Sequence, residues 1–222
     1  MGITFVGVNT FVSGSSSVTA LLPEGVEEGD LLLLHRGSTA SINVGVDGWT
    51  PISDSFNFYS NYYAQVLYKI AGASEGSVLV PDISGYNYAL ISAWRGVDPN
   101  DPINAYNTST DSGTTYVAAN PTSTKDNCML VGATYFINSS IGDTTNYDSI
   151  ANTSLESITE AYDISSSTLG AFWITYGIKA TAGAINNTTA TGDNSTGQQS
   201  GTTSILLNPI PALSPSNFFV FL

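Results

Sequence analysis

Short blocks of alternating apolar and polar residues run along the whole chain of 222 residues, and clusters of Gly, Pro, Asn, Asp and Ser separate them. Successive side chains of a β-strand point to opposite faces, so this alternation is typical of strands with one buried face. Helical spacing is nearly absent; only residues 155–162 offer a weak helical pattern, and a strand fits them equally well. The pattern predicts an all-β fold, an antiparallel β-sandwich.

The two clearest strands are expected at residues 62–71 and 169–180, each with four alternate apolar side chains on its inward face. These inward residues are Ala64, Val66, Tyr68 and Ile70 in the first strand and Phe172, Ile174, Tyr176 and Ile178 in the second. Further strands are expected at residues 17–22, 30–36, 87–95, 127–137 and 203–208. Three tryptophans lie in strand-like segments and are expected to be buried anchors of the sheets: Trp49, Trp94 and Trp173.

The two halves of the chain also resemble each other weakly. The segments that correspond are 29–34, 49–52, 66–71 and 89–94 in the first half and 126–131, 147–150, 174–180 and 203–207 in the second. A four-strand unit cannot cover its own apolar face, so two such units packed face to face would share one core. Two Greek-key halves in series describe a jelly roll. We therefore expect one jelly-roll domain over residues 1–208, with 30–36 and 127–137 in equivalent places; chance similarity of β-patterns is the alternative.

The charge balance restricts the partners of the chain. The formal net charge is −13, and the five cations are spread along the sequence as Arg36, Lys69, Arg95, Lys125 and Lys179. Binding to phosphate groups requires clustered Lys and Arg, so neither nucleic acid nor an anionic membrane is expected as a partner. No stretch approaches the roughly 18–20 apolar residues of a membrane helix.

The N-terminal residues lack the features of a secretion signal, since residues 1–5 have no basic start and no long apolar run or cleavage site follows. The composition nevertheless resembles that of an exported surface protein, because charged residues are only 10% and Ser, Thr, Asn and Gly supply the polarity. A virion protein reconciles the two observations: it is synthesised in the host cytoplasm without a signal peptide and works outside after lysis. The alternatives are an intracellular protein, unconventional export, or a chain whose signal was removed.

Five short segments between residues 22 and 99 carry a family resemblance, which extends over about residues 17–208. They read LPEGV at 22–26, GDLL at 29–32, GWT at 48–50, LYKIA at 67–71 and WRGVDP at 94–99. Their succession resembles jelly-roll β-sandwich modules of bacteriophage structural proteins and of bacterial secreted proteins. The resemblance implies a virion component, expected first as a capsid-surface decoration or cement protein and next as a tail or fibre-associated subunit. Its implied partners are further copies of the chain and other virion proteins. The alternative is a carbohydrate-binding or adhesion module that contacts a surface glycan.

Few residues are available for catalysis. His35 is the sole histidine and Cys128 the sole cysteine, which lies in an apolar strand, so Ser/His, Cys/His and two-histidine metal sites are not expected. A structural histidine and a buried, inert thiol are expected instead. Nearly all acids fall in turns; Glu156 and Glu160 are the exceptions and would be the first candidates in a glycoside hydrolase, the third function considered. We expect no enzyme and no cofactor.

The turn at Asp98, Asn100 and Asp101 is a weak calcium candidate, because two carboxylates and an amide are oxygen ligands that a hard cation prefers. The competing interpretation is a rigid turn, since Pro99 and Pro102 fix its backbone and the two acids can cap it. We expect no metal here.

An aromatic segment at residues 56–63 is the main candidate contact surface. Rings mixed with amides suit both sugar stacking and protein interfaces. Because Tyr62 and Tyr63 are expected to begin a strand, Phe56, Phe58 and Tyr59 are the better surface candidates for contact with a glycan or a partner.

The segment 209–222 is expected to be a proline-rich spacer followed by an apolar docking tail. Proline removes backbone donors and favours an extended chain after residue 208. The tail residues are Phe218, Phe219, Val220, Phe221 and Leu222. Burying even one Phe is worth roughly 1.5–3 kcal/mol, so the tail is expected to dock. It either inserts into a neighbouring subunit by strand addition, which makes it an assembly tail, or folds back on its own sandwich.

Overall fold

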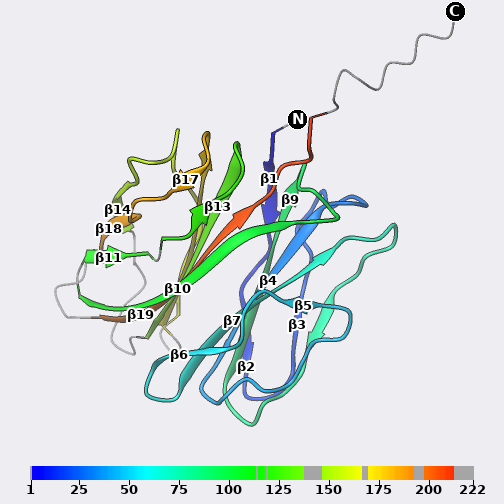
Figure 1. Cartoon of the computed structure of the whole chain (residues 1–222). Coiled ribbons are helices and arrows are strands. Elements are labelled where there is room, and N and C mark those ends of the chain that lie inside the picture. The colour runs from blue at the N-terminus through cyan, green and yellow to red at the C-terminus, as the bar shows by residue number, and fades with distance from the viewer. Residues whose placement is uncertain are drawn as a thin grey trace, which may run out of the picture.

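The structure is a computed structural model that describes residues 2–113, 115–118, 120–137, 147–166, 170–192 and 198–212. Regular structure in these residues is β-strand throughout, and two large antiparallel sheets face each other (Figure 1). The predicted all-β sandwich is therefore confirmed. Within the described ranges there is no helical segment of the length and apolarity that a membrane crossing requires.

The first large sheet is built from the first half of the chain, with β4 (Leu31–Ser38) at its centre. In spatial order its strands are β1 (Thr4–Val8) together with β2 (Val12–Gly14), then β9 (Asn87–Arg95), β4, β7 (Tyr62–Ile70), and last β5 (Thr50–Pro51) together with β6 (Phe56–Tyr59). The small ribbon of β3 (Val18–Ala20) and β8 (Val78–Val80) contacts the outer face of this sheet.

The second large sheet is built from the second half, with β13 (Cys128–Ile137) at its centre. In spatial order its strands are β10 (Ile103–Gly113), β19 (Gln198–Leu207), β13, β16 (Gly170–Lys179) and β15 (Thr159–Ser166). Two small sheets accompany it: β12 (Thr122–Ser123) with β17 (Gly183–Ala184), and β11 (Thr115–Val117) with β18 (Thr189–Gly192) and β14 (Tyr147–Ala151).

The two large sheets have the same pairing order. In each, the first strand pairs with the last (β1 with β9, β10 with β19), and the central strand (β4, β13) lies between the last strand and β7 or β16. The expectation that residues 30–36 and 127–137 occupy equivalent places is confirmed. The correspondence expected between 49–52 and 147–150 is wrong, because β5 lies at the edge of the first large sheet whereas β14 belongs to a small sheet with β11 and β18. The jelly-roll connection is not confirmed, because each large sheet takes all its strands from one half of the chain.

The turns before the two central strands support the same equivalence. Gly29 and Asn127 both adopt a left-handed backbone, with φ of 91° and 57°. The backbone N–H of Gly29 donates to the carbonyl of Ala71 at 2.9 Å, and that of Asn127 donates to Ala180 at 3.0 Å. Glycine and asparagine tolerate a left-handed backbone better than most residues do, and one of them stands at this position in each turn.

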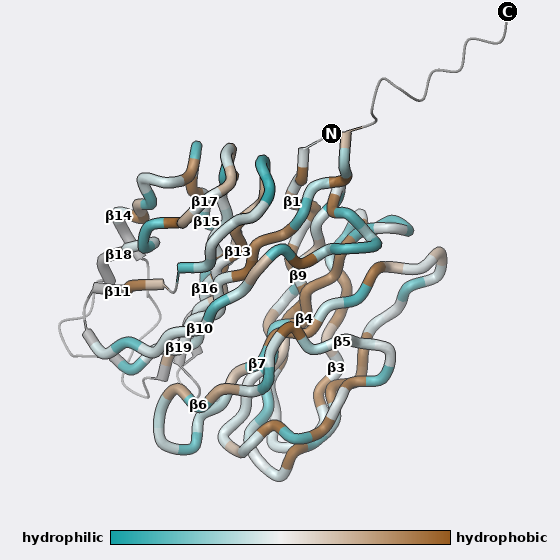
Figure 2. The backbone as a smooth tube through the Cα atoms, in the orientation of Figure 1, coloured by the Kyte–Doolittle hydropathy of each residue, from teal (hydrophilic) through white to brown (hydrophobic). Residues whose placement is uncertain are grey.

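The sheets meet across an apolar core to which both halves contribute. The first sheet supplies Leu31, Leu33, Leu90 and Trp94, and the second supplies Met129, Val131, Ile174 and Ile205. The predicted inward residues of the two clearest strands all belong to this core or pack against it. Figure 2 shows the apolar residues concentrated along β4, β9 and β13, while polar residues dominate the turns. Trp49, Trp94 and Trp173 are all buried, as predicted.

The leucine run at 31–34 shows how both faces of the first large sheet are covered. All four leucines are fully buried. Leu31 and Leu33 face the other sheet, whereas Leu32 and Leu34 pack against an outer cluster that includes Val18 of β3. Each half thus covers its own outer face and leaves one face for the other half, and the two sheets form without exchanging strands.

Two expectations for individual strands need correction. The strand expected at 203–208 begins at Gln198, and β10 was not expected at all. Both regions are rich in Ser, Thr and Asn, whose weak apolar alternation conceals the strand pattern. Of the two alternatives left open at residues 155–162, the helix is not found, and the strand is found from Thr159 onward.

Candidate functional site

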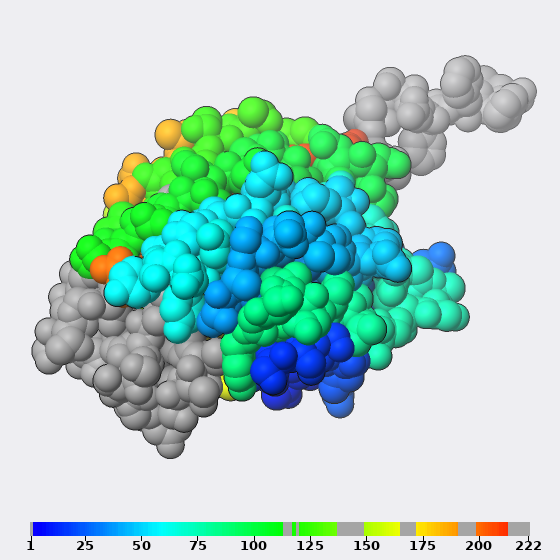
Figure 3. Space-filling view, turned by 90° about the horizontal axis from the view of Figure 1, so that it is seen from below, coloured from blue at the N-terminus to red at the C-terminus, as the bar shows by residue number. Residues whose placement is uncertain are grey.

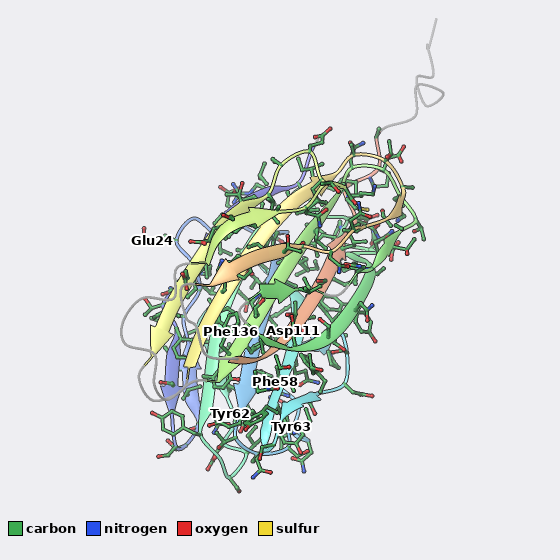
Figure 4. All side chains as sticks on the ribbon, turned by 90° about the vertical axis from the view of Figure 1, so that its left-hand side faces the viewer. Glu24, Phe58, Tyr62, Tyr63, Asp111 and Phe136 are labelled. Carbon is green, nitrogen blue, oxygen red and sulfur yellow. The ribbon has the colours of Figure 1, made fainter. Side chains whose placement is uncertain are left out.

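The aromatic segment proposed as a contact surface is divided by the fold. Phe58 is only 4% exposed, and its ring lies 6.1 Å from that of Tyr135 in the opposite sheet and 6.3 Å from that of Tyr62 (Figure 4). The expectation of a surface position for Phe58 is therefore wrong, because its place in β6 turns it toward the second sheet. Phe56 is partly buried, and Tyr59 remains at the surface with 46% exposure.

The turn at Asp98–Asp101 has partners for both carboxylates within the protein. Asp98 Oδ1 accepts the backbone N–H of Asn100 at 3.0 Å, and Lys125 Nζ lies 2.8 Å from Asp101 Oδ2. Asn208 Nδ2 also donates to the carbonyl of Asp101 at 2.7 Å. In the described part of the chain no group of three or more His, Cys, Asp or Glu could hold a metal ion. The capped turn accounts for these residues, and calcium binding stays an untested alternative.

His35 and Cys128 both lie in the interior. His35 is 1% exposed, its Nε2 lies 3.0 Å from Ser92 Oγ, and its ring packs on Phe172. Burial lowers the pKa of His35 to about 3, so the imidazole is neutral in the folded protein at physiological pH. Cys128 is fully buried, and burial raises the pKa of its thiol. The expected burial of the thiol is confirmed, and both side chains lie away from the surface.

The carboxylates near the edge strand β15 differ from the pair expected. Glu156 lies in the turn before the strand and is exposed, whereas Glu160 Oε2 accepts a hydrogen bond from the indole N–H of Trp173 at 3.0 Å. The pairing of β15 with β16 has a bulge between Glu160 and Tyr162, and Asp163 follows this bulge in β15. Burial, and after it the charge of Glu160, raises the pKa of Asp163 to about 7. Sequence reasoning missed Asp163, because a bulge of this kind leaves no mark in the residue pattern.

A groove on the outer face of the first sheet is the candidate site with a buried charge in its lining. A larger hollow, of about 600 Å³, lies elsewhere between Ile3, Asn127, Ile178 and Pro209. Two adjoining hollows, of about 490 and 380 Å³, share Val44, Gly45 and Trp49, and we call them together the Trp49 groove. The smaller hollow is further lined by Arg36, Ile42, Asn43, Pro51, Asp54, Ser55, Gln65 and Leu67. The larger is further lined by Asp47, Lys69, Glu75, Gly76, Ser77, Val78, Leu79 and Pro81. Figure 3 shows the first-half segments, coloured blue to cyan, side by side on this side of the molecule.

The strands position the floor of this groove. Arg36 follows Leu32 and Leu34 on the outward face of β4, and Gln65 lies opposite it on β7. Arg36 Nε and Nη2 donate to Gln65 Oε1 at 3.1 and 2.6 Å, and Nη2 also donates to the carbonyl of Val44 at 2.6 Å. Gln65 Nε2 in turn donates to the carbonyl of Ser53 at 3.0 Å. These bonds hold the loops at 39–49 and 51–55 over the sheet.

Arg36 is a buried cation with no counter-charge among the described residues. Its side chain is 2% exposed, all its acceptors are neutral, and its Nη1 atom is buried with no hydrogen-bond partner. Burial lowers the pKa of Arg36 to about 10, so the group is still cationic at neutral pH. A buried charge without a counter-charge is costly, and such sites are candidates for an anionic ligand. The one sequence signal is an arginine that follows four consecutive leucines and a histidine in the same strand.

The opposite end of the groove carries a balanced ion pair. Lys69 Nζ lies 2.8 Å from Glu75 Oε1. Burial alone would raise the pKa of Glu75, but the hydrogen bond and charge of Lys69 outweigh it, and the pKa is lowered. Val44 and Leu79, which are 43% and 63% exposed, form apolar walls here. The groove therefore combines an indole, amides, apolar walls and one uncompensated cation.

The tail residues Phe218–Leu222 lie outside the described residues. A scan of protein-family models and searches of curated proteins and of solved structures found no match to this chain.

Proposed function

We propose that this chain is a non-enzymatic structural component of a bacteriophage virion, placed on the capsid surface as a decoration or cement protein. The observation that carries the proposal is the extent of apolar packing. One apolar core joins the two halves, and further apolar clusters cover the outer faces of both sheets. The buried histidine and thiol have no access to substrate. Such a fold is rigid, which suits a structural role. The resemblance of five sequence segments to phage modules supports placing this role in a phage particle.

The proposal predicts that the purified chain binds particles that lack it. Full-length protein added to particles from a phage with the gene deleted is expected to bind saturably and to raise the temperature at which the particles rupture. A version lacking residues 213–222 is expected to keep its melting temperature, since the described strands already close both sheets by residue 208, but to lose particle binding and self-association. Sedimentation of particles and light scattering of the free protein measure both.

Two results would contradict these expectations. Full-length protein that never sediments with particles would exclude the decoration role. If the truncated protein unfolds, the tail belongs to its own sandwich, and the assembly role of Phe218–Leu222 is wrong.

A second candidate function, a carbohydrate-binding or adhesion module, is favoured by the Trp49 groove. An indole beside amides and a hollow of several hundred Å³ is the composition of a small-ligand site. Phe58 cannot take part in it, because its ring belongs to the core between the sheets.

A further inference from the structure

We infer that the Trp49 groove binds an acidic saccharide of the uronic-acid type, whose carboxylate is held by Arg36. The inference rests on the second candidate function and names its ligand class. It starts from two independent observations: a hollow lined by polar groups, and an arginine more than nine-tenths buried that lines it and lacks a counter-charge.

The absence of an ion pair at Arg36 indicates a negatively charged ligand. Three N–H contacts of its guanidinium go to the neutral acceptors Gln65 and Val44, and Nη1 has none. No ion pair joins Arg36 to any carboxylate of the described residues, although the chain as a whole has 18 acids and five Lys and Arg. Guanidinium groups pair best with planar carboxylate or phosphate. A carboxylate is the smaller of these anions and carries a single charge, which suits one arginine in an acidic protein.

The other lining side chains are polar, which indicates that the rest of the ligand carries hydroxyl groups. Asn43 and Asp54 are exposed at the same hollow, and the partly buried Ser55 also lines it. Asp54 would repel a second negative charge but can accept hydrogen bonds from hydroxyl groups. A hollow of about 380 Å³ accommodates a single sugar ring, and the adjoining 490 Å³ hollow leaves room for a second.

The shared wall between the two hollows supports the same ligand. Trp49 lines both hollows with the 9% of its surface that is exposed, so rings placed in either hollow would contact one indole. Aromatic side chains supply apolar surface against which the C–H bonds of a sugar can pack. At the far end Lys69 is already paired with Glu75, so Arg36 is the one cation of the groove without an ion pair. The exposed carboxylates of Asp47 and Asp54 also line the groove, and their repulsion restricts the ligand to a single negative charge held at Arg36.

The test is calorimetric titration of the full chain with cellobiouronate, a disaccharide that carries a single carboxylate, with the neutral disaccharide of the same linkage and with acetate, at about 0.15 M salt, where the screening length is about 8 Å. Cellobiouronate is expected to bind saturably and at least tenfold more tightly than either control. Arg36→Gln is expected to weaken its binding about tenfold or more, because a hydrogen bond to a charged group is lost. Arg36→Lys is expected to give an intermediate loss, and Asn43→Ala a loss of a few-fold.

The matched control is Lys125→Gln, which removes one positive charge at the distant Asp101 pair and is expected to leave the affinity unchanged. If Arg36→Gln does not fold, the affinities of Arg36→Lys and of the exposed Asn43→Ala test the inference in its place. Changes in the amide chemical shifts of the wild type then show where the ligand binds. Equal affinity for the neutral disaccharide, or an unchanged Arg36→Gln, would overturn the acidic-saccharide inference while leaving carbohydrate binding standing. Binding of acetate as tight as that of cellobiouronate would overturn the saccharide part. If none of the three probes binds, the inference and the second candidate function both fail.

Discussion

Gly201→Ala is expected to destabilise the protein by about 1–3 kcal/mol, although it adds only one methyl group. Gly201 is buried in β19 of the second sheet, and a Cβ placed there would lie 2.5 Å from Cγ of Phe58, which belongs to β6 of the first sheet. Carbon atoms do not approach this closely, so the ring or the sheets must move. Urea unfolding followed by tryptophan fluorescence measures the loss.

The same contact can be verified from the other side. Phe58→Ala alone is expected to cost about 3–5 kcal/mol, because it leaves a cavity between the sheets. In that background Gly201→Ala should cost at least about 1 kcal/mol less than in the wild type, since the clashing ring is gone. Gly76→Ala is the matched control: nothing lies within 4 Å of its added Cβ, and a change within about 0.5 kcal/mol is expected. Strict additivity of the two substitutions would contradict face-to-face packing at this point.

The second large effect is a loss of stability in acid that depends on His35. The pKa of His35 is lowered by burial to about 3, whereas an unfolded histidine titrates near 6.5. As the pH falls below about 6.5, the unfolded chain takes up a proton that the folded chain cannot, so stability is lost progressively until about pH 3. Between pH 7 and pH 4.5 the loss due to His35 is expected to be about 2–3 kcal/mol.

His35→Leu removes this dependence and isolates it. The free energy of unfolding of the wild type, compared with that of the variant, is expected to fall by about 2–3 kcal/mol from pH 7 to pH 4.5. The pKa of Asp163 is raised to about 7, so its contribution runs the opposite way and strengthens as the pH falls, but it is common to both proteins and cancels. His35 is the sole histidine, so no other imidazole contributes. A pH-independent difference between the two proteins would show that His35 titrates normally and is not buried.

The fold was predictable from the sequence where burial is one-sided. Strands such as β7 alternate cleanly, and their inward faces were predicted residue by residue. The duplication was predictable because both halves repeat the same order of apolar blocks. The connection of the sheets was not, because alternation indicates which face is buried but not which strand lies beside it. The continuous apolar run at Leu31–Leu34 was the one clue, since a strand buried on both faces belongs to a unit that already covers itself.

The candidate site was less predictable than the fold. Phe58 was placed at the surface because aromatic residues in turns suit interfaces, yet its strand position turns it into the core. Arg36 was counted only as one of five scattered cations. Its isolation depends on the loops at 39–49 and 51–55, which fold over β4 and β7, and such long-range contacts leave no local pattern.

The most direct test of the structural role is the amount of this chain in purified particles. Quantitative mass spectrometry of gradient-purified phage from the lysate is expected to find the chain in a fixed copy ratio to the major capsid protein, unchanged by further rounds of banding. A chain that stays in the particle-free supernatant, with only traces in the banded phage, would contradict the proposal that it is a component of the virion.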